Sequence, residues 1–568
     1  MPEQLKDLIA KAVKEILREN KLTSNDMLIE IETPKDTKFG DFSINVAMKL
    51  ARILKKSPVE IAELIKGLLL AKFRDLEIAG KIKKVEVKRP GFINIFLSDV
   101  ALYDVLRAIS KDTEGFARNN LGEGKKVLIE FVSANPTGPL SIAHARQAAV
   151  GDSLANIMNF CGFDVSREYY INDEGNQIKN LGLSLQARYM EILGKTVDFP
   201  EDGYKGKYLY ELAEKLVQSV GERYANDESL QAVEFFSDYA AGQILEQINE
   251  ELELFGVNFD SWYSQKRQIT PDKISAALND LKSKGYIYEK DGATWFKSTQ
   301  FNDDKDRVII KSNGLMTYLS PDIAYHRVKF KRGFDRLINI WGPDHHGYIN
   351  RLKAAVCALG HSPEDLSILI IQLATLSRGG KPVVMSTRAG EYITLGELMR
   401  EVGKDAARFF FLMRRCDSQL EFDLELAKKH SMENPVYYVQ YAHARISGIR
   451  KLFNELAGNG KLGVIKEPLE AARLCELVED ESFLLIRKLN SFPDILKNCA
   501  ECLDPQGLST YLRELAGDFH AFYNKYRIYS EGKENIEKSL ARFFLIDCVG
   551  RVIGLGLRLM RVEAPQEM

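Results

Sequence analysis

SANPTGPLSIAHARQAAVGDSLANI, Ser133 to Ile157, joins a strand to a helix through a turn rich in proline and glycine. The residues just before it, VLIEFV from Val127 to Val132, are mostly apolar and include β-branched side chains, which is typical of a buried strand. The following Asn-Pro-Thr-Gly-Pro cannot continue that strand, and a helical pattern begins at Ser141. The stretch therefore predicts a strand, a tight turn and a helix.

This join is suited to holding a phosphate group. The first amide groups of a helix have no partner within the helix, and together with the helix dipole they favour an anion at the turn. Alanines and Gly151 along the helix allow close packing against a sheet or a ligand. His144 lies on the first turn, where its ring can donate a hydrogen bond to an anion. The alternative is a tightly packed strand–helix unit with a structural histidine.

Length and composition indicate a large enzyme of about three domains, since the chain has 568 residues. The net charge of −2 excludes a basic field over the whole molecule, so any contact with RNA has to come from local patches. Seven cysteines are scattered, and the single Cys-x-x-Cys, at Cys499 and Cys502, is interpreted as two reduced thiols on a helix, with no protein-ligated metal. We expect no membrane partner and a cytoplasmic location, because the sequence MPEQLKDLIAKAVKEIL predicts an amphipathic helix of mixed charge.

The pattern along the chain predicts three units. Residues 1–110 alternate helix and strand and form an α+β domain, and residues 110–124 are interpreted as a linker. Residues 120–430 have apolar runs separated by helical stretches, as a parallel α/β sheet requires, with a helical insertion at about 181–300. Residues 431–568 are predicted to be helical throughout. The P-loop and dinucleotide-binding patterns are absent, so the phosphate site is of another kind.

The turn and helix resemble the His-x-Gly-His signature of class I aminoacyl-tRNA synthetases. SANPTGPL and REYYINDEGNQI, Arg167 to Ile178, are similar to arginyl-tRNA synthetases in particular. Two positions depart from the signature, because Ser141 replaces the first histidine and Ala143 replaces the glycine. A serine can cap the helix and donate a hydrogen bond, but it cannot carry charge.

The resemblance implies a fold and a reaction. The expected fold is a Rossmann-like catalytic domain with an α+β N-terminal domain that contacts the tRNA elbow and an all-α C-terminal domain that binds the anticodon. The expected reaction joins L-arginine to the 3′ adenosine of tRNA(Arg) through arginyl-adenylate, and it consumes ATP, with Mg²⁺ as part of the substrate. We expect the protein to act as a monomer.

A guanidinium pocket is implied at the ends of two segments. The implied arginine-binding residues are Glu130, Ser133, Asn135, Tyr318, Asp322 and His345. Guanidinium offers five donors in a fixed fork, which carboxylates and an amide oxygen can satisfy together. The spacing of Tyr318 and Asp322 places both on one face if a helix begins there. The alternative for this pair is a surface turn and a helix cap.

The ATP site is implied by the first signature and by VMSTR, Val384 to Arg388, which aligns with the mobile Lys-Met-Ser-Lys-Ser motif of class I enzymes. The implied ATP-binding residues are Pro136, Thr137, Gly138, Ser141, His144, Asp344, Met385 and Ser386. The implied catalytic residues are Ser141, His144, Ser386 and Arg388. Val384 and Thr387 replace the two lysines of the motif, so the positive charge has to come from elsewhere, and the candidates are Arg388, Lys381, Lys125 and Lys126.

The final unit offers aromatic and basic side chains that suit single-stranded RNA. The implied tRNA-binding residues are Tyr437, Tyr441, His443 and Arg445. Two alternatives to an active arginine enzyme remain open. One is a tRNA-binding relative with impaired catalysis, suggested by the replaced signature residues, and the other is a class I enzyme for another amino acid.

Overall fold

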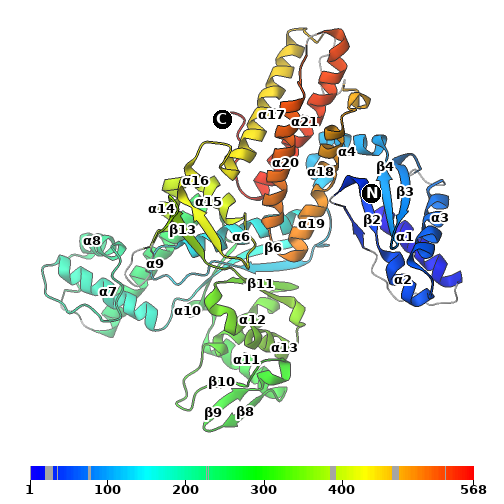
Figure 1. The fold of residues 1–568 in the computed structure, drawn as a ribbon. Helices are drawn as coiled ribbons and strands as arrows, with labels where there is room; N and C mark the ends of the chain where they lie inside the picture. The colour runs from blue at the N-terminus through cyan, green and yellow to red at the C-terminus, as the bar shows by residue number, and fades with distance from the viewer. Residues whose placement is uncertain are drawn as a thin grey trace.

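The computed structural model describes residues 2–19, 30–34, 36–74, 79–225, 227, 229–383, 392–462, 472–530 and 532–568. Figure 1 shows a central sheet, a helical bundle that rises from it, an N-terminal unit beside the bundle, and two further lobes on the opposite side. In these described residues, no helix combines the length and the apolar character that crossing a membrane requires.

The N-terminal unit packs three helices against an antiparallel sheet of order β1-β2-β4-β3. Its elements are α1 (Pro2–Glu19), β1 (Ile31–Glu32), β2 (Phe42–Ile44), α2 (Val46–Leu54), α3 (Pro58–Arg74), β3 (Ile82–Lys88) and β4 (Phe92–Leu97). Ile44, Ile93 and Ile95 from the sheet and Ile61 and Ile65 from α3 are fully buried, so alternation along the strands directs one face to the helices.

A parallel sheet forms the centre of the molecule, as the sequence predicts, and it has five strands. Its order is β12-β11-β5-β6-β7, with β5 (Lys126–Glu130) in the middle. The chain runs from β5 to β6 (Asp164–Ile171) and β7 (Ser261–Ser264) on one side, and then crosses to β11 (Arg336–Trp341) and β12 (Leu366–Ile370) on the other. This reversal lies between β5 and β11, and ligands of such sheets bind where the order reverses, at the carboxyl ends of the strands.

Helix α6 (Ile142–Phe160) connects β5 to β6 and is buried along most of its length. Gly151 lies so near the strand end that a Cβ atom there would be 2.4 Å from the Phe131 ring. The small residues of α6 therefore allow the helix to lie directly on the sheet, as predicted from the sequence.

The predicted insertion at 181–300 is two insertions instead of one. The first comprises α7 (Asn176–Ile192), α8 (Tyr208–Val220) and α9 (Leu230–Leu254), after which the chain returns to the sheet as β7. The second lies between β7 and β11 and carries α10 (Gln265–Gln268), α11 (Pro271–Ser283), β8 (Ile287–Lys290), β9 (Ala293–Phe296), β10 (Arg307–Ile310) and α12 (Leu319–Lys331). Helix α13 (Ile349–Leu359) then connects β11 to β12. The sequence SWYS of β7 is too short to be recognised as a strand within a helical region.

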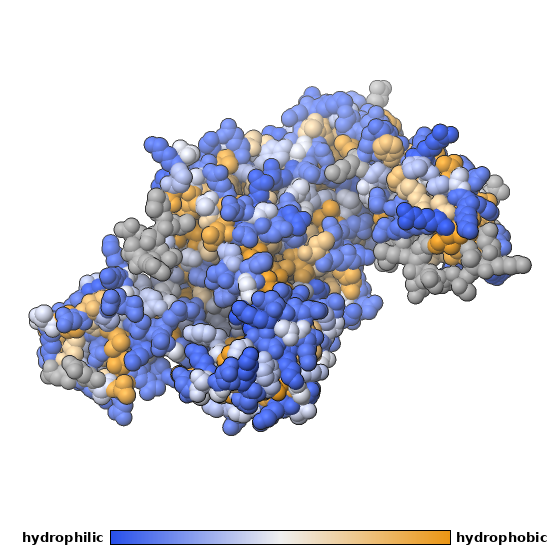
Figure 2. Space-filling view, turned by 60° about the horizontal axis from the view of Figure 1, so that its bottom comes forward, coloured by the Kyte–Doolittle hydropathy of each residue, from blue (hydrophilic) through white to orange (hydrophobic). Residues whose placement is uncertain are grey.

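A smaller sheet follows β12 and leads into the bundle. It has the order β14-β13-β15, in which β13 (Ala374–Arg378) pairs antiparallel with β14 (Lys381–Pro382) and parallel with β15 (Leu420–Asp423). Helices α14 (Leu395–Val402), α15 (Lys404–Phe411) and α16 (Leu424–Lys428) complete this region. Figure 2 shows hydrophobic side chains gathered on the middle of the face it displays, whereas the lobe nearest the viewer is mostly hydrophilic.

The described helices of the bundle are α17 (Pro435–Gly458), α18 (Asp480–Asn490), α19 (Phe492–Cys502), α20 (Gln506–Lys525) and α21 (Lys533–Leu559). The expected linker at 110–124 is partly helical, because α4 (Asp99–Lys111) is followed directly by α5 (Thr113–Ala117). Helix α4 contacts the bundle, where Tyr103 Oη donates to the Leu477 carbonyl at 3.1 Å. The N-terminal sheet is also tied to the bundle, since Arg487 Nε lies 2.5 Å from Asp41 Oδ1.

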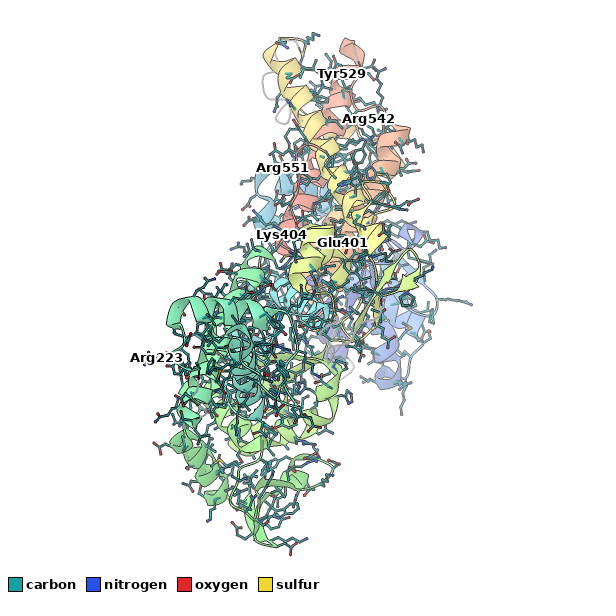
Figure 3. All side chains as sticks on the ribbon, turned by 90° about the vertical axis from the view of Figure 1, so that its left-hand side faces the viewer. Arg223, Glu401, Lys404, Tyr529, Arg542 and Arg551 are labelled. Carbon is teal, nitrogen blue, oxygen red and sulfur yellow. The ribbon has the colours of Figure 1, made fainter. Side chains whose placement is uncertain are left out.

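A fully buried arginine joins the sheet, the first insertion and the bundle. Arg408 on α15 donates to Asp152 Oδ2 on α6 at 2.7 Å, to the Phe255 carbonyl after α9 at 3.0 Å and to the Met560 carbonyl after α21 at 2.8 Å. The neighbouring Glu401 and Lys404 lie at the base of the bundle in Figure 3. Three segments far apart in the sequence therefore share one guanidinium.

Replacing Arg408 with methionine should lower the free energy of unfolding by about 3–5 kcal/mol, because Asp152 would keep a buried charge without its closest partner. The urea-unfolding midpoint measures this loss. Arg414→Met, which removes an exposed arginine six residues away, is the matched control and should change stability by less than about 0.5 kcal/mol.

The double variant with Asp152→Asn added should recover only part of the loss, because the buried carboxylate is then gone but Arg167, whose Nε lies 3.3 Å from Asp152 Oδ1, loses its ion pair. Equal midpoints for Arg408→Met and Arg414→Met would contradict the central role of this arginine.

Candidate active site

A cavity of about 800 Å³ opens at the carboxyl ends of β5 and β11, within the size range of small-molecule sites. The residues expected at the site that line it are Glu130, Ser133, Asn135, His144, Tyr318, Asp322, Asp344 and His345. The expected residues that do not line it are Pro136, Thr137, Gly138 and Ser141. Three further expected residues, Met385, Ser386 and Arg388, lie outside the described residues.

The last residue of β5, Glu130, is paired with a buried lysine. Lys329 on α12 is fully buried, and its Nζ donates to Glu130 Oε2 and, at 3.2 Å, to Asn339 Oδ1 on β11. Ser133 Oγ donates to the other carboxylate oxygen of Glu130 at 3.2 Å. The sequence placed Glu130 in the cavity but did not reveal that a lysine neutralises it.

Asp322 is the second carboxylate of the cavity; it is partly buried and lies in the first turn of α12. Tyr348 Oη donates to Asp322 Oδ2. Burial, supported by the charge of Glu130, raises the pKa of Asp322 to about 6, although the Tyr348 hydrogen bond and Lys329 oppose this. When Asp322 is ionised, it and Glu130 carry two negative charges against the single positive charge of Lys329. The buried part of the cavity then holds one uncompensated negative charge.

A histidine connects these groups. His326 Nδ1 lies 2.8 Å from the Asp322 carbonyl, and Asn339 Nδ2 lies 3.0 Å from His326 Nε2. Burial lowers the pKa of His326 to about 3, so the ring is neutral and donates from Nδ1 while it accepts at Nε2. The network fixes the position of α12 relative to β11.

His144 is held in one tautomer at the start of α6. Its Nδ1 accepts from the Ser141 backbone N–H at 3.2 Å, so the proton is on Nε2. Burial lowers the pKa of His144 to about 4, against the opposing charge of Asp344, and the ring is therefore neutral at pH 7. Ser141, expected among the ATP-binding and catalytic residues, orients His144, because its hydroxyl also lies 3.2 Å from Nδ1.

Tyr318, Asp344 and His345 lie at the mouth of the cavity. Tyr318 is 86% exposed and immediately precedes α12. His345 Nε2 lies 3.3 Å from Asp344 Oδ2, and both side chains are more than half exposed. These three groups are therefore free to contact a ligand that covers the opening, whereas Glu130 and Asp322 lie deeper.

The side chains proposed to replace the two lysines of the mobile motif do not all lie near the cavity. Lys125 and Lys126 stand at the amino end of β5, at the opposite end of the strand from the cavity, so they cannot serve it. Lys381 is exposed on β14 at the edge of the segment that contains VMSTR. The neighbouring Arg378 is paired with Glu401 at 2.9 Å. Of these candidates, Arg388 lies outside the described residues.

Three of the four expected tRNA-binding residues form one strip on α17. The Tyr437 and Tyr441 rings stack at 5.9 Å with an interplanar angle of 10°. Arg445 donates to Tyr441 Oη at 2.8 Å and also lies over the Tyr523 ring on α20. His443 does not belong to the strip, because its Nδ1 donates to the Pro565 carbonyl of the C-terminal segment at 2.8 Å.

Sequence reasoning missed several lining or supporting residues, namely Gln147, Tyr170, Lys329, Asn339 and Tyr348. Two of them have a signal in the sequence. Lys329 follows Asp322 by seven residues and Gln147 follows His144 by three, so helical periodicity places each on the same helix face as a residue expected at the site.

Comparison with protein families agrees with the geometry over nearly the whole chain. The Arginyl tRNA synthetase N terminal domain matches residues 3–97. The catalytic domain of tRNA synthetases class I (R) matches residues 105–417. The DALR anticodon binding domain matches residues 439–568.

Curated relatives match from end to end. An arginine–tRNA ligase of Citrifermentans bemidjiense is 45% identical and that of Bacillus subtilis is 43% identical, and both alignments cover 100% of this chain and at least 99% of the relative. The solved arginyl-tRNA synthetase of Thermus thermophilus has the same fold, with a TM-score of 0.75, 21% identity and complete coverage of both chains. The chain therefore belongs to the arginyl-tRNA synthetase family, the arginine–tRNA ligases of class I.

Proposed function

We propose that the cavity binds L-arginine through Asp322 and Glu130 and binds MgATP at the start of α6, and that it forms arginyl-adenylate before transfer to tRNA(Arg). The observation that carries this assignment is the charge of the buried part of the cavity. Glu130, Asp322 and Lys329 together leave one negative charge, which matches one guanidinium.

Selection of arginine follows from the acceptors. The fork of a guanidinium can donate to both carboxylates, whereas the urea group of citrulline would leave the charge of Asp322 uncompensated in a buried site. A lysine side chain would supply charge but not the planar fork. Ser133 and Asn135 lie beside these carboxylates on the turn, and Asn135 is held by a 2.6 Å hydrogen bond to Gln177 Oε1.

The ATP half of the site uses neutral donors. The helix amides at the start of α6 and the Nε2–H of His144 are suited to the α-phosphate, because hydrogen bonds and a helix dipole stabilise charge without adding a full cation. Pro136, Thr137 and Gly138 support these groups from behind the cavity wall. Asp344 and His345 at the mouth are suited to the adenosine and aminoacyl groups.

The reaction requires no general base. The arginine carboxylate is already an anion at neutral pH, so it can attack the α-phosphate in line once both substrates are oriented. Met385, Ser386 and Arg388 would then hold the departing pyrophosphate together with substrate magnesium. Lys381 supplies a further cation on the described side of that segment.

Transfer to tRNA engages the bundle. We assign the strip of Tyr437, Tyr441 and Arg445 to stacking on single-stranded bases, because two parallel rings and a guanidinium plane suit that contact. We propose that the protein acts as a monomer. A cytoplasmic location is consistent with its substrates.

Exchange of pyrophosphate into ATP tests the proposal. We expect exchange that depends on arginine, and we expect tRNA(Arg) to be required, as is usual in the family. Cysteine, glutamate and citrulline serve as control substrates. The absence of exchange with arginine, both with and without tRNA, would contradict the assignment, and exchange with cysteine or glutamate would point to a different pocket.

Asp322→Asn should raise the KM for arginine about 10–100-fold at pH 7, because a hydrogen bond to a charged group is lost. In the wild type, arginine affinity should be full above pH 6 and fall as the pH drops through the pKa of Asp322 at about 6. The variant should lack this pH dependence. An exposed carboxylate on α11, changed in Asp272→Asn, is the control.

Stability should change in the opposite direction. The pKa of Asp322 is raised from 3.8 to about 6 in the folded protein, so folding favours the neutral form and stability is lost as the pH rises between these values. Asn cannot ionise, so at pH 7 the free energy of unfolding of Asp322→Asn should exceed that of the wild type by on the order of 2–3 kcal/mol, whereas at pH 4 the two should be equal. Urea unfolding at the two pH values measures this difference.

An unchanged KM for arginine in Asp322→Asn would show that Asp322 does not bind arginine.

His144→Ala should slow arginine activation about 100-fold, while tRNA affinity in a filter-binding assay stays within twofold, because one donor to the phosphate is removed. Since the pKa of His144 is near 4, its ionisation should not appear in the rate profile between pH 6 and 8. His346→Ala, which changes an exposed neighbouring histidine, is the control. Equal losses of rate and tRNA affinity would argue against a phosphate role.

A further inference from the structure

The turn that precedes α6 contains carbonyl groups that no regular element satisfies. Pro136 and Pro139 have no N–H group, and the turn belongs to no sheet ladder, so the carbonyls must find partners elsewhere. Three tyrosine hydroxyls supply them. Tyr169 donates to the Ala134 carbonyl at 2.9 Å, Tyr208 to the Thr137 carbonyl at 2.5 Å and Tyr392 to the Pro139 carbonyl at 3.0 Å.

The three tyrosines come from separate parts of the chain. Tyr169 belongs to β6, Tyr208 is the first residue of α8 in the first insertion, and Tyr392 stands just before α14. Burial raises the pKa of each of them, so all three remain neutral donors at physiological pH. The hydroxyls of Tyr208 and Tyr392 bind carbonyl groups that are two residues apart in the turn, at Thr137 and Pro139.

The far end of the turn is bonded to the same region as Tyr392. The Leu395 N–H donates to the Leu140 carbonyl at 2.8 Å, and Ser141 forms a β-bridge with Thr394. Helix α6 begins at the next residue, Ile142. A displacement of Tyr208 or Tyr392 would therefore move the start of α6 and the His144 ring that Ser141 orients.

We propose that Tyr208 and Tyr392 are positioning residues for ATP, because their hydroxyls set the place of the turn and of the α6 amides relative to the α-phosphate. The inference rests on the proposed function, in which the start of α6 holds that phosphate. It assigns the first insertion a part in catalysis, because Tyr208 is the residue through which α8 reaches the turn. Gly138 leaves room for this contact, since a Cβ there would lie 3.3 Å from Tyr208 Oη.

Phenylalanine substitution isolates the hydroxyl, because the ring and its packing are retained. Tyr208→Phe and Tyr392→Phe should each lower kcat/KM for ATP about tenfold in pyrophosphate exchange, and the double variant further, since small misplacements of reacting groups are costly. The KM for arginine should stay within twofold of the wild type. This contrast separates positioning from general damage, which would affect both substrates.

Tyr210→Phe is the matched control, because Tyr210 lies on the same helix and its ring covers Arg188 instead of the turn. Its kinetics should equal those of the wild type. Wild-type ATP kinetics in both Tyr208→Phe and Tyr392→Phe would overturn the inference, as would equal losses for arginine and ATP.

His144→Ala in the same assay distinguishes a failure of the positioning role of the tyrosines from a failure of the proposed phosphate site. If it slows activation while the tyrosine variants do not, the positioning role fails and the proposed function stands. If neither His144→Ala nor the tyrosine variants change ATP kinetics, the phosphate site itself is misassigned and both fail. Should one tyrosine variant not fold, the other decides, because each hydroxyl contacts a different carbonyl.

Discussion

The buried pair of Arg408 and Asp152 is the contact on which the architecture depends. Asp152 lies on α6, the helix that also presents His144, so the pair ties the helix of the active site to the frame of the molecule. The remaining donors of Arg408 bind backbone carbonyls at the end of the first insertion and at the end of α21. A guanidinium suits this junction because its fork can satisfy several acceptors at once without being deprotonated.

A second buried arginine, on α6 itself, repeats the principle nearer the cavity. Arg146 donates to the carbonyls of Gln372, Arg415 and Ser418, and it is fully buried. Gln372 lines the cavity and lies two residues beyond the end of β12, so the helix that carries His144 also holds the opposite wall. The active site is therefore assembled around α6, and Arg146 and Arg408 bind backbone carbonyls around this helix instead of lining the cavity.

Much of this could be predicted from the sequence, because the features concerned are local. The strand, turn and helix around Ser133–Ile157 and the alternation of strands and helices depend on nearby residues, and the charged residues of the cavity lie in recognisable segments. The partners that decide their chemistry were not predictable. Lys329 meets Glu130, and Tyr208 and Tyr392 meet the turn, through contacts between residues 71 to 253 positions apart. The position of His443 outside the strip was predictable from helical spacing. His443 follows Tyr441 by two residues, which places the two side chains on opposite faces of the helix.

The contact between Arg408 and the Met560 carbonyl can form only late in translation, because Met560 is near the end of the chain. A chain emerges from the ribosome from its N-terminal end, and domains fold as they become available. The catalytic unit is complete in sequence long before residue 560 is made, yet its central guanidinium still lacks one of its acceptor groups, the Met560 carbonyl. A polypeptide that ends before residue 560 would therefore lack a buried contact within the catalytic unit itself. Arg408 gains its full set of partners only after translation has passed residue 560.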